Sequence, residues 1–201
     1  MNHFYEDVYG FALFDLFALY KKVVERFNSG SHFVEVGTFL GKSAVYMAVE
    51  IINSGKNIKF DCIDHWEGSE EHSDNDKINL DTMYEDFLKN IEPVKGTINP
   101  IKMSSIDASK LYETNSLDFI FIDASHDEHS VREDLTHWMP RLKEDGVIAG
   151  DDINNPDVAS AVRWFFDDEK LNIAGRQWFV DLGDEFEIVY PRINSGVKGR
   201  K

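Results

Sequence analysis

A short loop with two glycines follows the first strongly apolar segment of the chain and has the residue types of a ligand-binding turn. The segment HFVEV ends at Val36, and the sequence GTFLGKS follows it. Glycine lets the backbone turn sharply and approach a ligand closely, and the amides that open the next helix favour a carboxylate or phosphate. An acid at the strand end suits a cationic group. We therefore predict a site for a molecule with an ammonium and a carboxylate group, contacted by Glu35, Gly37, Thr38, Gly41 and Ser43.

The methionine part of S-adenosylmethionine carries both groups, so this cofactor is the favoured ligand. A dinucleotide loop requires G-x-G-x-x-G, which Thr38 and Phe39 interrupt. A P-loop requires a glycine where this chain has Val36, although Gly41-Lys42-Ser43 matches its end. A P-loop-like nucleotide-binding phosphotransferase and a plain turn without a ligand stay open as alternatives.

The acid that ends the second apolar segment is a candidate ribose ligand. Asp64 follows FDCI, and an acid at that strand end can accept hydrogen bonds from ribose hydroxyls. The alternative is a helix-capping or turn aspartate. The indole of Trp66, two residues later, is predicted to lie against the adenine or the acceptor substrate.

Three further acids follow apolar segments, and they form a candidate metal site. Asp123 follows FIFI, and Asp151 and Asp152 follow VIAG. Carboxylates that lie close together repel one another unless a cation or proton is shared, and oxygen ligands suit a hard divalent ion such as Mg²⁺. His126 could take a proton from a hydroxyl group. The alternatives are that Asp151 and Asp152 cap a helix and that His126 is a solvated loop residue.

These residues need a scaffold that brings strand ends together, and the hydrophobic pattern predicts one. Apolar strand-like segments alternate with amphipathic helical segments, which is typical of an α/β protein with a doubly wound, mostly parallel Rossmann-like sheet. In such sheets ligands bind beyond the carboxyl ends of the strands. Strands are expected at 32–36, 58–63, 97–103, 117–122 and 147–149 and twice within 172–190, and helices within 5–27 and at 43–53, 78–91, 105–112, 131–142 and 157–168.

The length of 201 residues suits one domain. We expect a single domain over residues 1–195 that begins with a helical segment at 1–30 and includes a candidate substrate lid at 66–90. Residues 196–201 are expected to form a flexible tail, because the end of the chain is rich in glycine and basic residues.

A formal net charge of −16 argues against nucleic-acid and anionic-membrane partners. The N-terminal segment carries acids where a secretory signal has bases, and no stretch is apolar enough to span a membrane. We therefore expect a cytoplasmic protein. Its apolar N-terminal helical face could pack on the sheet or form a homodimer.

The sequence FVEVGTFLGKSAVYMA resembles the first motif of catechol O-methyltransferase-like enzymes. The stretch FIDASHDEHSVREDLTHWMPRLKEDGVIAGDDI resembles the second half of the class I S-adenosylmethionine-dependent methyltransferases that include macrocin-type sugar O-methyltransferases. The resemblance covers residues 33–166. The segment QWFVDLGDEFEIVY resembles the antiparallel hairpin that closes the seven-stranded sheet of that family.

The resemblance implies methyl transfer to the oxygen of a small-molecule acceptor, a sugar or a phenol, with S-adenosylmethionine as donor and a divalent metal, Mg²⁺ by preference. It implies that the glycine loop holds the methionine moiety, Asp64 the ribose and Ser105 the adenine. Asp123, Asp151 and Asp152 match the metal ligands, with Asp123 also catalytic. His126 stands where the catechol enzymes place a catalytic lysine, so the identity of the base is open. A binding protein on this fold that has lost catalysis is a further alternative.

Overall fold

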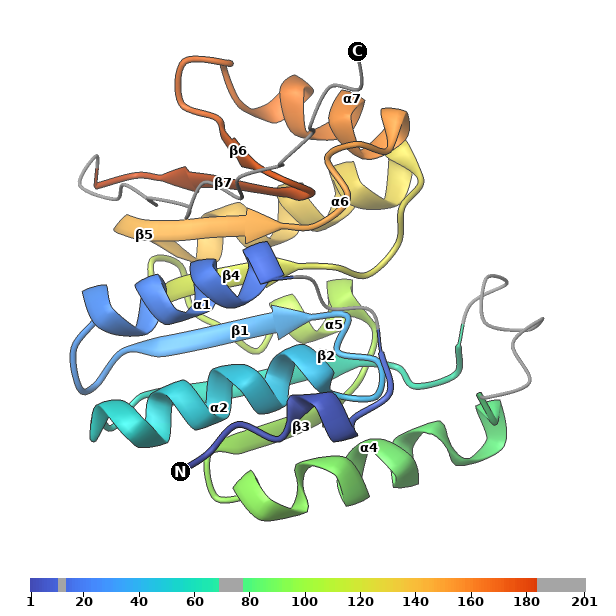
Figure 1. The fold of residues 1–201 in the computed structure, drawn as a ribbon. Helices are drawn as coiled ribbons and strands as arrows, with labels where there is room; N and C mark the ends of the chain where they lie inside the picture. Colours follow the sequence, from blue (N-terminus) through green and yellow to red (C-terminus); the bar gives the residue numbers. More distant parts are fainter. Residues whose placement is uncertain (11–13, 69–77, 184–201) are drawn as a thin grey trace, which may run out of the picture.

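The computed structural model describes residues 1–10, 14–68 and 78–183, and in them strands and helices alternate along the chain (Figure 1). The strands are β1 (His32–Val36), β2 (Lys59–Asp64), β3 (Ile98–Lys102), β4 (Leu117–Ile122), β5 (Leu142–Gly150), β6 (Asn172–Ala174) and β7 (Gln177–Asp181). The α-helices are α1 (Phe14–Arg26), α2 (Lys42–Ser54), α4 (Met83–Ile91), α5 (Ser105–Ser109), α6 (Glu128–Trp138) and α7 (Pro156–Phe165). Short 3₁₀ turns are η1 (Tyr5–Asp7), η2 (Leu80–Thr82), η3 (Glu92–Val94) and η4 (Met139–Arg141).

The strands form one seven-stranded sheet in the order β3-β2-β1-β4-β5-β7-β6. The first five strands pair in parallel, whereas β7 runs antiparallel to both β5 and β6. The predicted fold class, a mostly parallel Rossmann-like sheet with an antiparallel C-terminal hairpin, is confirmed. The order reverses between β1 and β4, and the carboxyl ends of these strands meet there, which is where such sheets bind ligands.

Alternate side chains along the strands pack into two hydrophobic cores, one on each face of the sheet. On one face, α1, α2 and α4 cover a core that includes Phe33, Phe60 and Phe121. On the other, α5, α6 and α7 cover a core that includes Ile120 and Trp138. Because both faces are covered, the parallel strands read as continuous apolar runs rather than as alternating ones.

The two strands expected within 172–190 are present as an antiparallel pair, and the described residues cover only the first half of QWFVDLGDEFEIVY. β6 and β7 pair Asn172 with Phe179 and Ala174 with Gln177, so β7 forms the start of that segment. Gly175 turns the chain between them with φ of 61°, a left-handed conformation that glycine adopts at little cost. Residues 184–190 lie outside the described part of the chain.

Other boundaries differ by a few residues. The N-terminal helical pattern resolves into η1 and α1, and β5 extends upstream of the expected strand to Leu142. Residues 69–77 of the candidate lid and the tail 196–201 lie outside the described residues. Within the described ranges, none of the helices is long and apolar enough to cross a membrane.

Candidate active site

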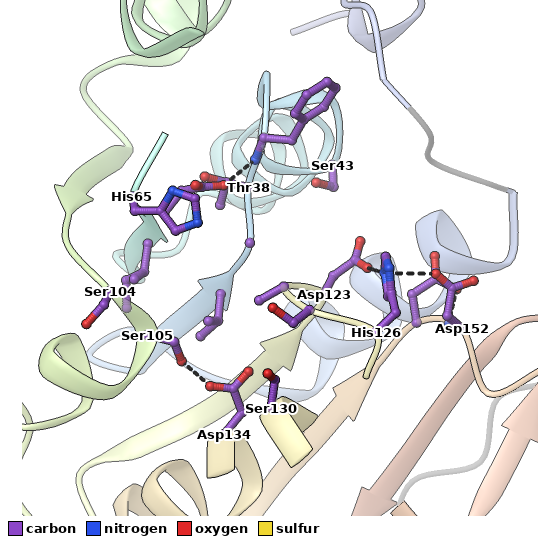
Figure 2. A pocket seen from close by; sticks show the side chains of 18 of the residues that line it. Thr38, Ser43, His65, Ser104, Ser105, Asp123, His126, Ser130, Asp134 and Asp152 are labelled. Atoms are coloured by element: carbon purple, nitrogen blue, oxygen red, sulfur yellow. Dashed lines mark hydrogen bonds and ion pairs between the residues drawn. The ribbon is translucent and has the colours of Figure 1, made fainter. Parts of the chain in front are cut away.

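A cavity of about 910 Å³ opens along the carboxyl ends of the parallel strands. The loops that follow β1, β2, β3, β4 and β5 all contribute to its wall. Among the polar side chains labelled in Figure 2, two groups stand out, with Ser105, Ser130 and Asp134 in one and Asp123, His126 and Asp152 in the other. Most residues predicted from the sequence therefore do lie around one space. They are Gly37, Thr38, Ser43, Asp64, Ser105, Asp123, His126, Asp151 and Asp152.

The glycine loop passes close to the end of β4. Gly37 has φ of +84°, and a Cβ atom there would lie 2.1 Å from the carbonyl oxygen of Asp123, so no larger residue fits. Gly41 is also left-handed and leads directly into α2. Thr38 is buried, lines the cavity and has an Oγ1 atom with no hydrogen-bond partner in the described chain. A buried hydroxyl without a partner is costly, so this loop fits a polar ligand group that would bond to Thr38.

Glu35 lies beneath this loop and does not line the cavity. Its carboxylate accepts hydrogen bonds from Tyr20 of α1 (2.9 Å) and from Ser43 of α2 (2.5 Å). Burial raises the pKa of Glu35 to about 8, although the two hydrogen bonds act in the opposite direction. Glu35 therefore links α1, β1 and α2 and holds the Ser43 side chain. Its contact with a cationic group of the cofactor stays a prediction.

Asp64 ends β2 and lies in the cavity wall. Its two carboxylate oxygens accept from the backbone amides of Phe39 (2.9 Å) and Trp66 (2.8 Å). These bonds tie the glycine loop to the loop after β2. Because each carboxylate oxygen has a second lone pair, Asp64 can still accept hydrogen bonds from ribose hydroxyls.

Trp66 does not occupy the predicted position beside the ligand. It is buried, it is absent from the cavity wall, and its ring packs on Tyr84 and Phe87 of α4 at centroid distances of 4.7 Å. Its Nε1 donates to the carbonyl oxygen of Phe39 (2.7 Å). An indole that must both bury its apolar surface and satisfy its N–H does so here by bracing the glycine loop against α4.

The cavity wall beyond β3 contains a chain of hydrogen bonds between α5 and α6. The indole Nε1 of Trp138 donates to Ser105 Oγ (2.9 Å), and Ser105 donates in turn to Asp134 Oδ1. Burial raises the pKa of Asp134 to about 6, and the bond from Ser105 opposes that shift. Ser105 is thus fixed in the wall where the adenine was predicted.

The second group of polar residues, Asp123, His126 and Asp152, contains two of the three predicted ligands of a divalent cation. Asp123, His126 and Asp152 each offer one ligand atom, and these atoms lie within 4.8 Å of one another. His126 Nε2 is 3.1 Å from Asp152 Oδ2 and 3.8 Å from Asp123 Oδ1. Two carboxylates and one imidazole are a donor set that divalent ions accept. The structure thus brings together two of the three predicted ligands, with His126 as the third member.

The charges in this cluster perturb one another. Burial, together with the nearby carboxylates of Asp151 and Asp152, raises the pKa of Asp123 to about 6, against the effect of His126. The contacts with Asp123 and Asp152 raise the pKa of His126 to about 11. The contacts from His126 and Arg176 hold the pKa of Asp152 below its usual range. In this state His126 is a protonated partner of the two carboxylates.

Asp151, the third predicted ligand, is held by neighbouring residues. Its Oδ1 accepts from the backbone amide of Asp152 (2.6 Å) and from Gln177 Nε2 (3.2 Å). The same oxygen lies 3.5 Å from Arg176 Nε. The role of Asp151 as a metal ligand stays a prediction.

Several residues of the site were not anticipated from the sequence. Tyr20 lies in an apolar helical pattern and Asp134 in an amphipathic one, so neither shows a signal of its own. Arg176 had a detectable signal, because Gly175-Arg176 separates two short strand-like segments. A two-residue turn containing glycine between such segments is typical of a hairpin, and a hairpin beside β5 brings its turn to the end of VIAGDD.

Residues 34–153 match a family model described as a methyltransferase domain. The chain belongs to this methyltransferase family. The family resemblance inferred from the sequence is therefore confirmed, and the P-loop alternative is not favoured. A search of curated proteins gives no match.

Solved structures share the fold of this methyltransferase at low sequence identity. Rv0187 from MTB, in a cofactor-bound structure, has a TM-score of 0.64 at 12% identity, over 88% of this chain and 84% of that one. A candidate caffeoyl-CoA O-methyltransferase from Staphylococcus aureus has a TM-score of 0.62 at 15% identity, over 88% and 87%. The O-methyltransferase NovP has a TM-score of 0.61 at 15% identity, over 82% and 78%. At these identities the likeness concerns the fold.

Proposed function

We propose that this methyltransferase uses S-adenosylmethionine to methylate a hydroxyl oxygen of a small molecule, with the help of a divalent cation. The observation that carries the proposal is one continuous cavity, in a chain of a methyltransferase family, that joins the glycine loop, Asp64 and the Asp123 cluster. Two solved structures with this fold are described as O-methyltransferases, one of them as a candidate, which favours oxygen as the accepting atom.

The cofactor is proposed to lie across the sheet with its ends held by different strand loops. The amides at the start of α2, with Thr38 and Ser43, would bind the methionine carboxylate. Asp123, across the loop, would bind the ammonium group. Asp64 would accept from the ribose hydroxyls, and the wall at Ser105 would contact the adenine. This arrangement gives the orphaned Thr38 hydroxyl a partner.

The reaction is a displacement in which the acceptor oxygen attacks the methyl carbon of the sulfonium, the carbon–sulfur bond breaks, and S-adenosylhomocysteine leaves. The methyl group is already activated by the sulfonium charge, so the chain has to orient the reactants and receive the hydroxyl proton. A bound divalent cation would make the hydroxyl easier to deprotonate, and Asp123 and Asp152 are placed to hold it, with Asp151 as a further candidate. His126 borders the cavity. It would be the proton acceptor only after a cation has engaged Asp123 and Asp152, because these carboxylates keep it protonated in the metal-free chain.

The acceptor is proposed to be a neutral or cationic small molecule, such as a sugar or a phenol. Six carboxylates border the cavity, so a strongly anionic acceptor would be repelled. They are Asp64, Asp123, Glu133, Asp134, Asp151 and Asp152. A cytoplasmic location remains a proposal, and so does the absence of nucleic-acid and membrane partners, which is based on the net charge of −16.

Calorimetry with S-adenosylhomocysteine, and separately with ATP and Mg²⁺, tests the cofactor. We expect the wild-type protein to bind S-adenosylhomocysteine and not ATP. Asp64→Asn should weaken binding about ten-fold or more, because hydrogen bonds to a charged acceptor are worth about 1.5–3 kcal/mol. Asp145→Asn, at an exposed position outside the cavity, is the matched control and should bind normally. Binding of ATP alone would refute the proposal.

A labelled-methyl assay against a panel of sugars, phenols and amines tests the chemistry. Transfer to a hydroxyl that is lost in EDTA and restored by Mg²⁺ supports metal-assisted O-methylation. Transfer to amines alone would overturn the assignment of the accepting atom, and activity that is indifferent to EDTA would overturn metal assistance. A cofactor-binding protein without any transfer would be a protein of this fold that has lost catalysis.

A further inference from the structure

The turn between β6 and β7 places a guanidinium group at the acidic cluster. Arg176 follows the left-handed Gly175, and its carbonyl oxygen accepts from the backbone amide of Ile153 (2.9 Å). The next residue, Gln177, donates to Asp151 (3.2 Å). The hairpin turn is therefore attached to the loop that carries Asp151 and Asp152, and Arg176 lines the cavity from there.

Both oxygens of Asp152 face cations of the chain itself. Arg176 Nη2 donates to Oδ1, and His126 Nε2 lies 3.1 Å from Oδ2 (Figure 2 shows the His126 contact). Arg176 Nε is buried, makes no hydrogen bond and lies 3.5 Å from Asp151 Oδ1. The guanidinium thus contacts both carboxylates at the end of β5, while 38% of the Arg176 side chain is exposed.

A divalent cation and this guanidinium would repel each other at Asp152. Mg²⁺ binds carboxylate oxygens at about 2.0–2.1 Å and Ca²⁺ at about 2.3–2.6 Å. The ion could use the second lone pair of Oδ1 or bind Oδ2, which faces His126, but at these short separations each cation would weaken the binding of the other. The ion would therefore bind more tightly once Arg176 has moved away from Asp152.

We propose that Arg176 is an internal counter-ion that competes with the divalent cation for Asp152 and so sets the affinity of the site for metal. The inference rests on the proposed metal-assisted function, which does not itself require such a competitor. The chain neutralises Asp152 with Arg176 when no metal is bound, and metal binding releases the guanidinium. Arg176 is a positioning residue in this scheme, because it acts through Asp152.

Binding of Mn²⁺ alone to the full chain, after treatment with EDTA and without any methyl donor, tests the competition by electron paramagnetic resonance of free Mn²⁺. Arg176→Met removes the charge and keeps most of the side-chain length. This variant should bind Mn²⁺ about ten-fold more tightly than wild type, within the usual range of coupling between two ligands. Arg176→Lys should give an intermediate affinity. Arg163→Met, which removes a guanidinium that pairs with Asp168 outside the cavity, should match wild type.

Equal or weaker Mn²⁺ binding by Arg176→Met would overturn the competition, and so would the absence of binding in both proteins. A second measurement is made on the wild-type protein, so its result does not depend on how a substitution affects the fold. The side-chain nitrogen resonance of Arg176, assigned by its loss in Arg176→Lys, should shift when Mg²⁺ is added to the wild-type chain. An unchanged resonance at a Mg²⁺ concentration that saturates the site would contradict the proposal. Failure to bind S-adenosylhomocysteine in EDTA would instead count against the proposed function.

Discussion

At the scale of single residues, the glycine loop requires glycine at position 37, because a Cβ atom there would clash with the backbone of Asp123. Replacement of Gly37 by alanine would place a methyl group 2.1 Å from the carbonyl oxygen of Asp123. Because backbone cannot move aside as a flexible side chain can, Gly37→Ala should lower the free energy of unfolding by about 3 kcal/mol or more. It should also abolish binding of S-adenosylhomocysteine, as the loop and Asp123 would be pushed apart.

Gly30 provides the matched control for this prediction. It also has a left-handed backbone, with φ of +95°, but nothing lies within 4 Å of its hypothetical Cβ. Gly30→Ala should therefore show only the cost of the left-handed conformation, about 1–2 kcal/mol. Urea unfolding of the two variants separates the close contact from the backbone strain. Equal losses would mean that the approach of the glycine loop to Asp123 is not what requires glycine.

Glu35 gives a prediction about pH. Its pKa is about 8 in the folded chain, against an ordinary value of 4.5. A group whose pKa rises on folding stabilises the fold fully below its unfolded pKa and loses that contribution as the pH rises through its folded pKa. The contribution of Glu35 to the free energy of unfolding of the cofactor-free protein should therefore decrease between about pH 4.5 and 8.

Comparison of wild type with Glu35→Gln, whose side chain resembles the neutral acid, isolates the contribution of Glu35 to stability. The variant should gain stability relative to wild type as the pH increases from 5 to about 8, measured by urea unfolding at each pH. Ser43→Ala, which removes a hydrogen bond that favours the charged carboxylate, should raise the pKa of Glu35 in the folded chain and so extend the decrease in stability to higher pH. A constant difference between Glu35→Gln and wild type would show that Glu35 is ionised in the fold.

At the scale of elements, the sequence best predicted the strands that one property identifies, namely an apolar composition that follows from burial on both faces. The apolar runs of β1, β2 and β4 are buried on both faces, so their composition alone identifies them. The strand β6 could not be located in this way, since NIA is short and polar at its start. Register depends on the Gly175 turn and on pairing with β5, which are tertiary properties.

The residues of the candidate site also divide into those that the sequence predicts and those that it does not. Residues directly at strand ends, such as Asp64 and Asp123, reach the cavity because parallel strands end at one edge. Trp66 follows a strand end too, yet packing against α4 turns it away. Tyr20 and Asp134, from other elements, reach the site through tertiary contacts that no spacing in the sequence encodes, whereas Arg176 has only the hairpin signal of the Gly175-Arg176 turn.

The contacts of Lys56 with the end of α1 give a prediction at the scale of elements. The ammonium group of Lys56 donates to the carbonyl oxygens of Val24, Glu25 and Phe27 near the end of the helix, at 2.6–2.9 Å. These carbonyls have no intrahelical donors. Lys56→Met should therefore destabilise the protein by about 1–3 kcal/mol, the value of hydrogen bonds to a charged donor.

The exposed residue Lys59, whose side chain makes none of these contacts, is the control, and Lys59→Met should change stability by less than about 0.5 kcal/mol. Hydrogen exchange should show faster opening of the last turn of α1 in Lys56→Met. Since α1 also carries Tyr20, cofactor affinity should fall modestly. Equal stability of the two variants in urea would mean that water replaces the ammonium group at these carbonyls.

At the scale of the whole molecule, the excess of acids over bases opposes the compact state. The chain has 37 acidic and 21 basic residues, a formal net charge of −16. Self-repulsion of this kind is screened by salt, because the Debye length falls from about 30 Å at 0.01 M to about 10 Å at 0.1 M. The Tm of the protein should thus rise by several degrees as NaCl increases over that range, with the steepest change at the lowest concentrations.

The cause of such a rise can be separated from specific ion effects. EDTA throughout excludes stabilisation by divalent cations at the acidic cluster, and choline chloride should act like NaCl, since screening depends on ionic strength alone. Repetition near pH 4.7, the isoelectric point, removes the net charge and should leave Tm almost independent of salt. If the rise of Tm with salt persists there unchanged, local repulsion between like charges rather than the overall net charge limits the stability of this fold.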